Sequence, residues 1–279
     1  MISSLMIEPL VRAALLEDLG RAGDITTESV VPAQARAETE LVARQPGVIA
    51  GLDVAALAFR LVEPAVQIEI ERPDGTRVQP GDRIAAIEGP ARGVLTAERV
   101  ALNFLGHLSG VATATATLVD AVTGHKARIC CTRKTMPGLR AVQKYAVRVG
   151  GGTNHRFGLD DGVLIKDNHV AIAGGVAAAI RAARAGVGHL VKIEVEVDTL
   201  EQLDEALEVG VDAVLLDNMG PDTLAEAVRR IAGRAITEAS GRITPATAPA
   251  IAAAGVDLIS AGWLTHSAAV LDIGLDWRN

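Results

Sequence analysis

After residue 125 the chain alternates short apolar runs with segments of helical pattern, and this rhythm constrains the fold more than any other feature. Each run is rich in β-branched residues and ends in polar ones; the runs are RICCTRK, GVLIKDNH, VKIEVEV, AVLLDN, RAITEASG and DLISAGWLTH. Helical segments such as TLEQLDEALEVG separate them. Strands that alternate with helices pair in parallel. Because no GxGxxG fingerprint opens the series, we predict a (β/α) barrel or barrel-like sheet rather than an open, doubly wound sheet.

The first part of the chain has a different organisation. Residues 5–19 have the apolar spacing of a helix, and residues 36–90 contain alternating strands separated by turn sequences. Residues 94–119 form a long helical stretch, which we expect to be broken around Gly106 and Gly110 because glycine weakens a helix interior. We therefore predict an α+β domain of antiparallel character in front of the barrel.

Polar residues follow every predicted strand of the barrel. Active sites in such folds lie at the carboxyl ends of the strands. In this chain those ends carry Arg133, Lys134, Lys166, Glu196, Asp217, Ser240, Gly262 and His266. Any one of these residues is ordinary loop composition, but complementary charges at all the strand ends indicate a site.

The cations concentrate in one segment of an acidic protein. The net charge is −7, yet residues 126–166 contain nine Lys and Arg against two acidic residues. The overall charge disfavours nucleic acid as a partner, whereas a local cationic site favours a small anionic ligand. Arginine binds a carboxylate bidentately, and lysine provides a point charge for phosphate or carboxylate. A polyanionic ligand is therefore predicted by Arg133, Lys134, His155, Arg156 and Lys166.

Acidic and small residues complete the predicted site. The alternation in KIEVEV directs Lys192, Glu194 and Glu196 into the barrel, where we expect Lys192 and Glu194 to pair with each other. Glu196 and Asp217 are better placed for a ligand, and they either hold Mg²⁺ together with waters or only balance the lysines. The loops EASGR and SAGWLTHS suit phosphate through their backbone N–H groups.

The sequence also predicts where the protein resides. Cys130 and Cys131 are adjacent, which fits neither a zinc site nor a disulfide framework and favours buried thiols in a reducing compartment. The acidic residue Glu8 interrupts the N-terminal segment too early for the apolar region of a signal peptide. No apolar run reaches membrane length. We therefore expect a soluble, cytoplasmic protein.

A series of motifs resembles one enzyme family, in order, over almost the whole chain. The motifs are GDITTESVVP, ARQPGVIAG, ERVALNFLGHLSGVAT, TRKTMPGLR, GGGTNHRFGLDDGVLIKDNH, KIEVEVDTLEQ, LLDNM, EASGRIT and SAGWLTHS. They are similar to those of quinolinate phosphoribosyltransferase, also called nicotinate-nucleotide pyrophosphorylase (carboxylating). The resemblance implies an α/β fold like that of the type II phosphoribosyltransferases. An N-terminal α/β sandwich domain (1–107) would precede an incomplete (β/α) barrel (108–268), and a C-terminal segment (269–279) would return to the first domain.

The resemblance also implies an activity. Such an enzyme transfers the phosphoribosyl group of phosphoribosyl pyrophosphate (PRPP) to quinolinate with decarboxylation, which gives nicotinate mononucleotide, pyrophosphate and CO₂ in de novo NAD biosynthesis. Mg²⁺ is the implied cofactor. The family works as a head-to-tail homodimer, in which Arg99 would reach the site of the partner subunit. No nucleic acid or membrane partner is expected.

Individual site residues follow from the same resemblance. The implied catalytic residues are Lys134, Lys166, Glu196 and Asp217, of which Glu196 and Asp217 would also hold the metal. Quinolinate would be bound by Arg99, Thr132, Arg133, Lys134, His155, Arg156 and Lys166. PRPP would be bound by Arg44, Lys134, Lys166, Glu196, Asp217, Ser240, Gly241, Gly262 and His266. The run Gly150–Gly152 would allow a tight backbone path that delivers His155 and Arg156 to the quinolinate carboxylates.

Three positions depart from the family pattern. Arg242 stands where members usually have glycine, Trp263 where the residue is typically small, and Met136 where it is typically threonine. The long side chain of Arg242 either contacts phosphate or points to solvent.

Three other functions stay open. A paralogue encoded in molybdenum operons shares the scaffold but has a different substrate, and the carboxylate-binding set argues against it. A Schiff-base aldolase could use Lys166, but that lysine would need an apolar pocket and has Asp167 beside it in sequence. A non-catalytic anion sensor would not need Glu196 and Asp217.

Overall fold

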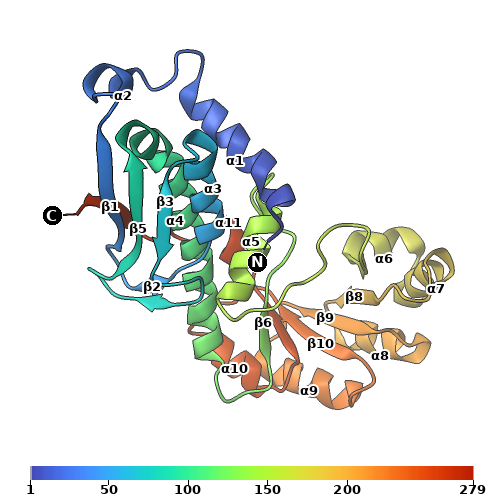
Figure 1. The fold of residues 1–279 in the computed structure, drawn as a ribbon. Helices are drawn as coiled ribbons and strands as arrows, with labels where there is room; N and C mark the ends of the chain where they lie inside the picture. The colour runs from blue at the N-terminus through green and yellow to red at the C-terminus, as the bar shows by residue number, and fades with distance from the viewer. Residues whose placement is uncertain (1, 279) are drawn as a thin grey trace. The chain divides into compact units, whose positions relative to one another are not determined.

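The chain folds into two compact units, and the computed structural model describes residues 2–278 (Figure 1). The first unit comprises Met1–Ala116, Met136–Gly151 and Thr265–Asn279, and the second comprises Thr117–Thr135 and Gly152–Leu264. Residues 136–151 thus cluster with the first unit, whereas the sequence places them in the barrel domain.

The first unit contains a four-stranded antiparallel sheet in the order β12-β1-β5-β3. Leu275 pairs with Leu41, so the last strand of the chain lies beside the first one (Figure 1). The strands of this sheet are β1 (Arg36–Ala43), β3 (Gln67–Ile70), β5 (Arg83–Pro90) and β12 (Ile273–Trp277). The unit also contains the ladder of β2 (Gly47–Val48) and β4 (Arg77–Val78) and the helices α1 (Ser4–Leu19), α2 (Ile25–Val30), α3 (Leu52–Val62) and α5 (Arg140–Val149).

A single long helix, α4 (Ala91–Ala121), spans the stretch that the sequence predicts to be broken. The expected breaks are wrong because the two glycines serve packing. A Cβ at Gly110 would lie 2.0 Å from the carbonyl oxygen of Ala269, and a Cβ at Gly106 would lie 2.9 Å from that of Leu271. The N–H of Leu271 also donates to the Gly106 carbonyl at 3.0 Å. The glycines therefore let the chain cross close to the helix.

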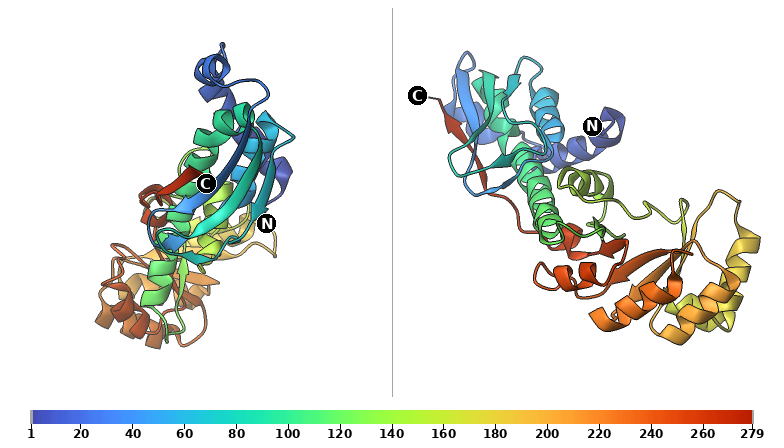
Figure 2. Two further views of the ribbon diagram at one scale, coloured as in Figure 1. Left: turned by 60° about the vertical axis from the view of Figure 1, so that its left-hand side comes forward. Right: turned by 90° about the horizontal axis from the view of Figure 1, so that it is seen from below.

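The second unit is built on a six-stranded parallel sheet in the order β6-β11-β10-β9-β8-β7. The strands are β6 (Arg128–Cys130), β7 (Val163–Ile165), β8 (Ile193–Val197), β9 (Ala213–Asp217), β10 (Ile236–Ser240) and β11 (Leu258–Ser260). The helices are α6 (Asp167–Ala173), α7 (Val176–Gly186), α8 (Leu200–Val209), α9 (Pro221–Ile231) and α10 (Ala248–Ala253). Helices α7 to α10 lie along one face of the sheet (Figure 2). Each of the six predicted runs forms one strand, and the predicted α/β class with an incomplete barrel is confirmed.

The last helix, α11 (Trp263–His266), is a single turn. Within residues 2–278, no helix combines the length and the apolar character that crossing a membrane requires.

Candidate active site

A cavity of about 340 Å³ lies at the carboxyl ends of the parallel strands of the second unit. It is lined by Thr132, Arg133, Lys134, His155, Arg156, Leu164, Lys166, Glu196, Leu215, Asp217, Glu238, Ser240 and Ser260. The sequence-predicted residues of this unit are all among them, apart from Gly241 and Gly262. The strand ends therefore bring together the cations, the acids and two serines, as parallel pairing dictates.

The two predicted glycines lie where a side chain would collide with a neighbour. Gly241 has a left-handed backbone with φ +99°, and a Cβ there would lie 2.2 Å from Oδ1 of Asn218. A Cβ on Gly262 would lie 2.8 Å from Cδ of Lys134. Gly262 thus leaves room for the Lys134 side chain to lie across the end of β11.

Three predicted residues belong to the first unit instead, and the cavity lining does not include them. Arg44 forms an ion pair with Asp276. The Nδ1 atom of His266 lies 2.6 Å from Oγ of Ser267. Arg99 is exposed on α4. The ligand contacts implied for these residues stay predictions.

Two arginines form the cationic side of the cavity. The Nε–H groups of Arg133 and Arg156 are buried and have no hydrogen-bond acceptor among residues 2–278. Nη1 of Arg156 donates to the Gly162 carbonyl at 3.0 Å. Burial lowers the pKa of Arg156, and the charge of Arg133 lowers it further. Two neighbouring guanidinium groups with spare donors are suited to a ligand that carries two negative charges.

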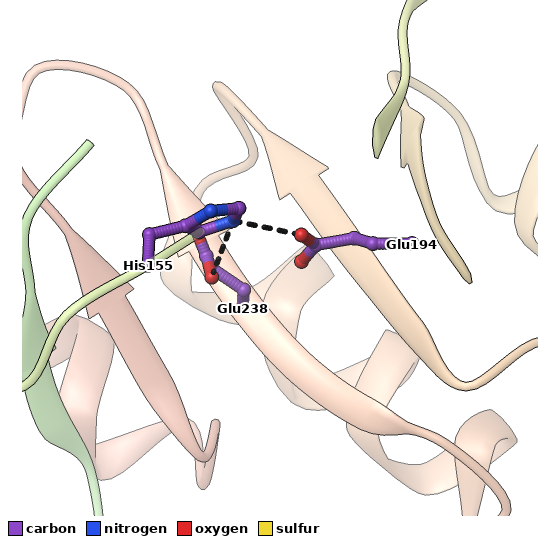
Figure 3. A group of neighbouring side chains, drawn as sticks. All are labelled: His155, Glu194 and Glu238. Atoms are coloured by element: carbon purple, nitrogen blue, oxygen red, sulfur yellow. Dashed lines mark hydrogen bonds and ion pairs between the residues drawn. The ribbon is translucent and has the colours of Figure 1, made fainter. Parts of the chain in front are cut away.

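His155 links the cavity to two glutamates inside the barrel (Figure 3). Its Nε2 lies 2.8 Å from Oε2 of Glu194 and 3.6 Å from Oε2 of Glu238. Its Nδ1 accepts a hydrogen bond from the backbone N–H of Arg156 at 2.8 Å. This pattern places the ring proton on Nε2 and gives both nitrogens partners within the protein. In this arrangement His155 orients the Arg156 backbone, and its direct contact with a ligand carboxylate stays a prediction.

The sequence analysis did not assign Glu238 to the site. Its side chain is 2% exposed, and burial, followed by repulsion from Glu194, raises its pKa to about 7. Its Oε1 has no hydrogen-bond partner in the described part of the chain. A signal for it existed, because Glu196, Asp217 and Glu238 recur every 21 residues. The sheet register shows that Leu215 pairs with both Glu196 and Glu238, so these two glutamates lie at one level of the barrel.

The expected pair between Lys192 and Glu194 is wrong. Nζ of Lys192 lies 2.5 Å from Oδ1 of Asp212, because Lys192 precedes β8 and is exposed. Glu194 faces the barrel interior and binds His155 instead. Among residues 2–278, His155, Glu194 and Glu238 also form a group of metal-ligand type, with donor atoms within 4.8 Å of one another.

The acidic side of the cavity lies on neighbouring strands. Nζ of Lys166 is 3.2 Å from Oε2 of Glu196 at the end of β8. Oδ2 of Asp217, which ends β9, accepts a hydrogen bond of 2.6 Å from Nδ2 of Asn218. Two carboxylates beside a cavity fit Mg²⁺, which is usually held by one or two carboxylates, waters and substrate phosphates. The backbone N–H of Lys166 donates to Nδ1 of His169 at 2.9 Å, which fixes the turn that presents this lysine.

The loop after Ser240 contains one of the three departures from the family pattern, Arg242, and is contacted by a second, Trp263 of α11. Arg242 has a left-handed backbone with φ 50°, and its exposed side chain is not part of the cavity lining. Nε1 of Trp263 donates to the Ile243 carbonyl at 2.8 Å. The larger side chain of Trp263 thus fastens this loop. The third departure, Met136, is exposed in the first unit.

Replacing Arg242 by glycine should stabilise the protein. The Cβ of any other residue strains a left-handed backbone, and glycine removes this strain. We expect Arg242→Gly to raise the free energy of unfolding by about 1 kcal/mol, which urea unfolding would measure. A less stable variant would show instead that the arginine side chain makes a stabilising contact.

The run Gly150–Gly152 serves the path of the backbone. A Cβ at Gly150 would lie 2.4 Å from the carbonyl oxygen of Ala112, and Gly151 has φ +88°. Two residues later, Thr153 pairs with Cys130 beside β6. The glycines thus permit a close helix contact and a turn immediately before the segment that carries His155.

Comparison with known proteins gives consistent matches over the whole chain. A family model described as quinolinate phosphoribosyl transferase, N-terminal domain, matches residues 24–109. The corresponding C-terminal domain model matches residues 111–276.

Individual relatives and solved structures agree with these matches. A nicotinate-nucleotide pyrophosphorylase (carboxylating) of Mycobacterium leprae is 50% identical over 95% of this chain and 95% of its own length. A probable enzyme of the same name from Bacillus subtilis is 44% identical over 98% of this chain and 93% of its own. The crystal structure of NadC from Streptococcus pyogenes has a TM-score of 0.95 at 41% identity, covering 100% of this chain and 99% of that one.

Proposed function

The chain belongs to the quinolinate phosphoribosyltransferase family, and we propose that it transfers the phosphoribosyl group of PRPP to quinolinate with loss of CO₂, as part of de novo NAD biosynthesis. The observation that carries this function is the pair Arg133 and Arg156, whose Nε–H groups are buried and have no acceptor among residues 2–278. Both residues line one cavity, and two guanidinium groups suit the two adjacent carboxylates of quinolinate.

The arrangement of charge supports the first chemical step. The pyridine nitrogen attacks the anomeric carbon of PRPP while the bond to pyrophosphate breaks, and positive charge develops on the ribose ring. Glu196 and Asp217 line the cavity on neighbouring strands and would stabilise this charge. Lys134 and Lys166 lie in the same cavity and would bind the anionic groups of both substrates.

Decarboxylation then follows from the product of transfer. The bond to the 2-carboxylate breaks with its electron pair staying on C2, and the positive charge of the quaternised ring nitrogen stabilises the resulting carbanion. C2 takes up a proton, which gives nicotinate mononucleotide and CO₂. The arginine pair would hold the ring in place during this step, so no covalent nucleophile from the protein is required.

Mg²⁺ is proposed as the cofactor, with Glu196 and Asp217 holding it through oxygen atoms or waters. When bound, it would neutralise charge on the leaving pyrophosphate. Lys166 already pairs with Glu196, so this lysine would balance the carboxylate in the absence of substrate.

The proposal is tested by product formation from alternative bases. Protein incubated with Mg²⁺, PRPP and quinolinate should give nicotinate mononucleotide and pyrophosphate, which mass spectrometry would identify. Nicotinate, which lacks the 2-carboxylate, should give far less product. Product from another base but none from quinolinate would support the paralogue instead. The aldolase alternative is disfavoured because Lys166 is ion-paired at the cavity and 48% exposed rather than enclosed by apolar residues.

We propose further that the enzyme is a homodimer in which Arg99 of one subunit completes the site of the other. Arg99→Ala and Lys166→Ala should each abolish activity. In a mixture that has exchanged subunits, hybrid dimers would contain one intact site, so about a quarter of the parent activity should return. Activity that does not return on mixing would contradict a shared site.

A further inference from the structure

Asn218 lies between two parts of the site that the mechanism treats separately. Asp217 and Ser240 pair with each other at the ends of β9 and β10. Asn218 follows immediately, and its backbone N–H donates to the Ser240 carbonyl at 3.0 Å. Its backbone thus joins the acidic end of one strand to the small-residue loop that follows the other.

The side chain of Asn218 makes a second connection between the same two parts. Its Nδ2 donates to Oδ2 of Asp217 at 2.6 Å. Its Oδ1 occupies the space beside Gly241, where an added Cβ would approach to 2.2 Å. The Asn218 backbone is left-handed, with φ 54°, a conformation that asparagine adopts more readily than most residues. Asn218 is thus exposed and has a left-handed backbone, while its amide nitrogen bonds Asp217 and its amide oxygen lies beside Gly241.

We propose that Asn218 is a positioning residue for the phosphoribosyl donor. Its amide restricts the Asp217 carboxylate and keeps a fixed spacing between that carboxylate and the Ser240–Gly241 loop. Ribose and phosphate contacts of one PRPP molecule depend on this spacing. The inference rests on the proposed function, because it places PRPP across Asp217 and Ser240. A neutral donor is suited to this role, since it orients the carboxylate without adding a charge that would compete with Mg²⁺.

The test compares Asn218→Gly with a matched control. Glycine keeps the left-handed backbone and removes only the side chain. We expect the dissociation constant of PRPP, measured by calorimetry with Mg²⁺ and without quinolinate, to rise roughly tenfold. The KM for PRPP should rise with it, while the KM for quinolinate stays within about twofold. Ala232 is also left-handed, with φ 47°, and lies at the end of α9, so Ala232→Gly should change neither constant.

A second variant tests the hydrogen bond itself. Asn218→Asp keeps the size of the side chain but replaces the donor with a carboxylate that repels Asp217. It should bind PRPP at least as weakly as Asn218→Gly, and binding as tight as that of the parent would overturn the inference. Equal losses for PRPP and quinolinate in Asn218→Gly would also overturn it, because they would indicate a general structural role. If the parent itself neither binds PRPP nor forms product, the proposed function fails, which is a separate outcome.

Discussion

Arg156→Ala is expected to lower kcat/KM for quinolinate roughly a thousandfold, because on the proposed function it would remove a charge-assisted pair of hydrogen bonds to the substrate. The guanidinium of Arg156 lies beside Arg133, and its Nε–H has no acceptor among residues 2–278. On the proposed function, a bound dianion would supply the missing partner. Steady-state kinetics with quinolinate as the varied substrate would measure the loss.

The thermal stability of Arg156→Ala should not fall with its activity. Burial and the charge of Arg133 both lower the pKa of Arg156, so the charged form is disfavoured in the protein without substrate. Arg156→Ala should therefore unfold at the same temperature as the parent or at a higher one. Arg156→Lys should recover little activity, since lysine lacks the bidentate fork. Arg181→Ala, at an exposed position on α7, is the control and should match the parent.

A loss below tenfold in Arg156→Ala would contradict a direct role in binding quinolinate. PRPP affinity provides a further check, because calorimetry should show it nearly unchanged in this variant. An equal fall in PRPP affinity would indicate that the substitution disturbs the whole cavity.

Glu238→Gln should stabilise the protein at about pH 8 and remove a pH dependence of its stability. The pKa of Glu238 is about 7 in the folded protein, above its value of 4.5 in the unfolded chain, because burial and Glu194 disfavour the charged form. Between pH 4.5 and about pH 7 the folded state therefore keeps the Glu238 proton, which the unfolded state has already released. The stabilisation is fully present below about pH 4.5 and is lost as the pH rises through about 7.

The raised pKa of Glu238 corresponds to a change of at most about 3 kcal/mol in the free energy of unfolding. Glutamine imitates the protonated carboxyl group, so Glu238→Gln should match the parent near pH 4.5 and exceed it by up to this amount near pH 8. Chemical unfolding at a series of pH values measures the difference. Glu208→Gln, at an exposed position on α8, should leave the profile unchanged. A parallel profile for Glu238→Gln and the parent would contradict the raised pKa.

The sheet and most of the cavity could be predicted from the sequence because they depend on periodicity. The period-two alternation of KIEVEV places Ile193, Val195 and Val197 in the core and leaves the glutamates inside the barrel. Parallel strands then bring their carboxyl ends to one edge, so Arg133, Lys166 and Asp217 meet although they lie far apart in the chain.

Contacts that depend on register and on side-chain direction could not be predicted in this way. The repeat of 21 residues aligns Asp217 with Glu238, whereas the observed register pairs Asp217 with Ser240. Glu194 was expected to pair with its near neighbour Lys192, but inside the barrel it meets His155 from a different segment. Helix α4 likewise continues through Gly110 because a distant segment packs there, which no local propensity reveals.

The fate of the 2-carboxylate of quinolinate tests the central claim most directly. Quinolinate labelled with radiocarbon in that carboxylate should release labelled CO₂ in equal amount to the nicotinate mononucleotide formed, and only when PRPP and Mg²⁺ are present. Label in the 3-carboxylate should stay in the nucleotide. Release of label without PRPP, or nucleotide that retains the 2-carboxylate label, would contradict a decarboxylating phosphoribosyl transfer at this site.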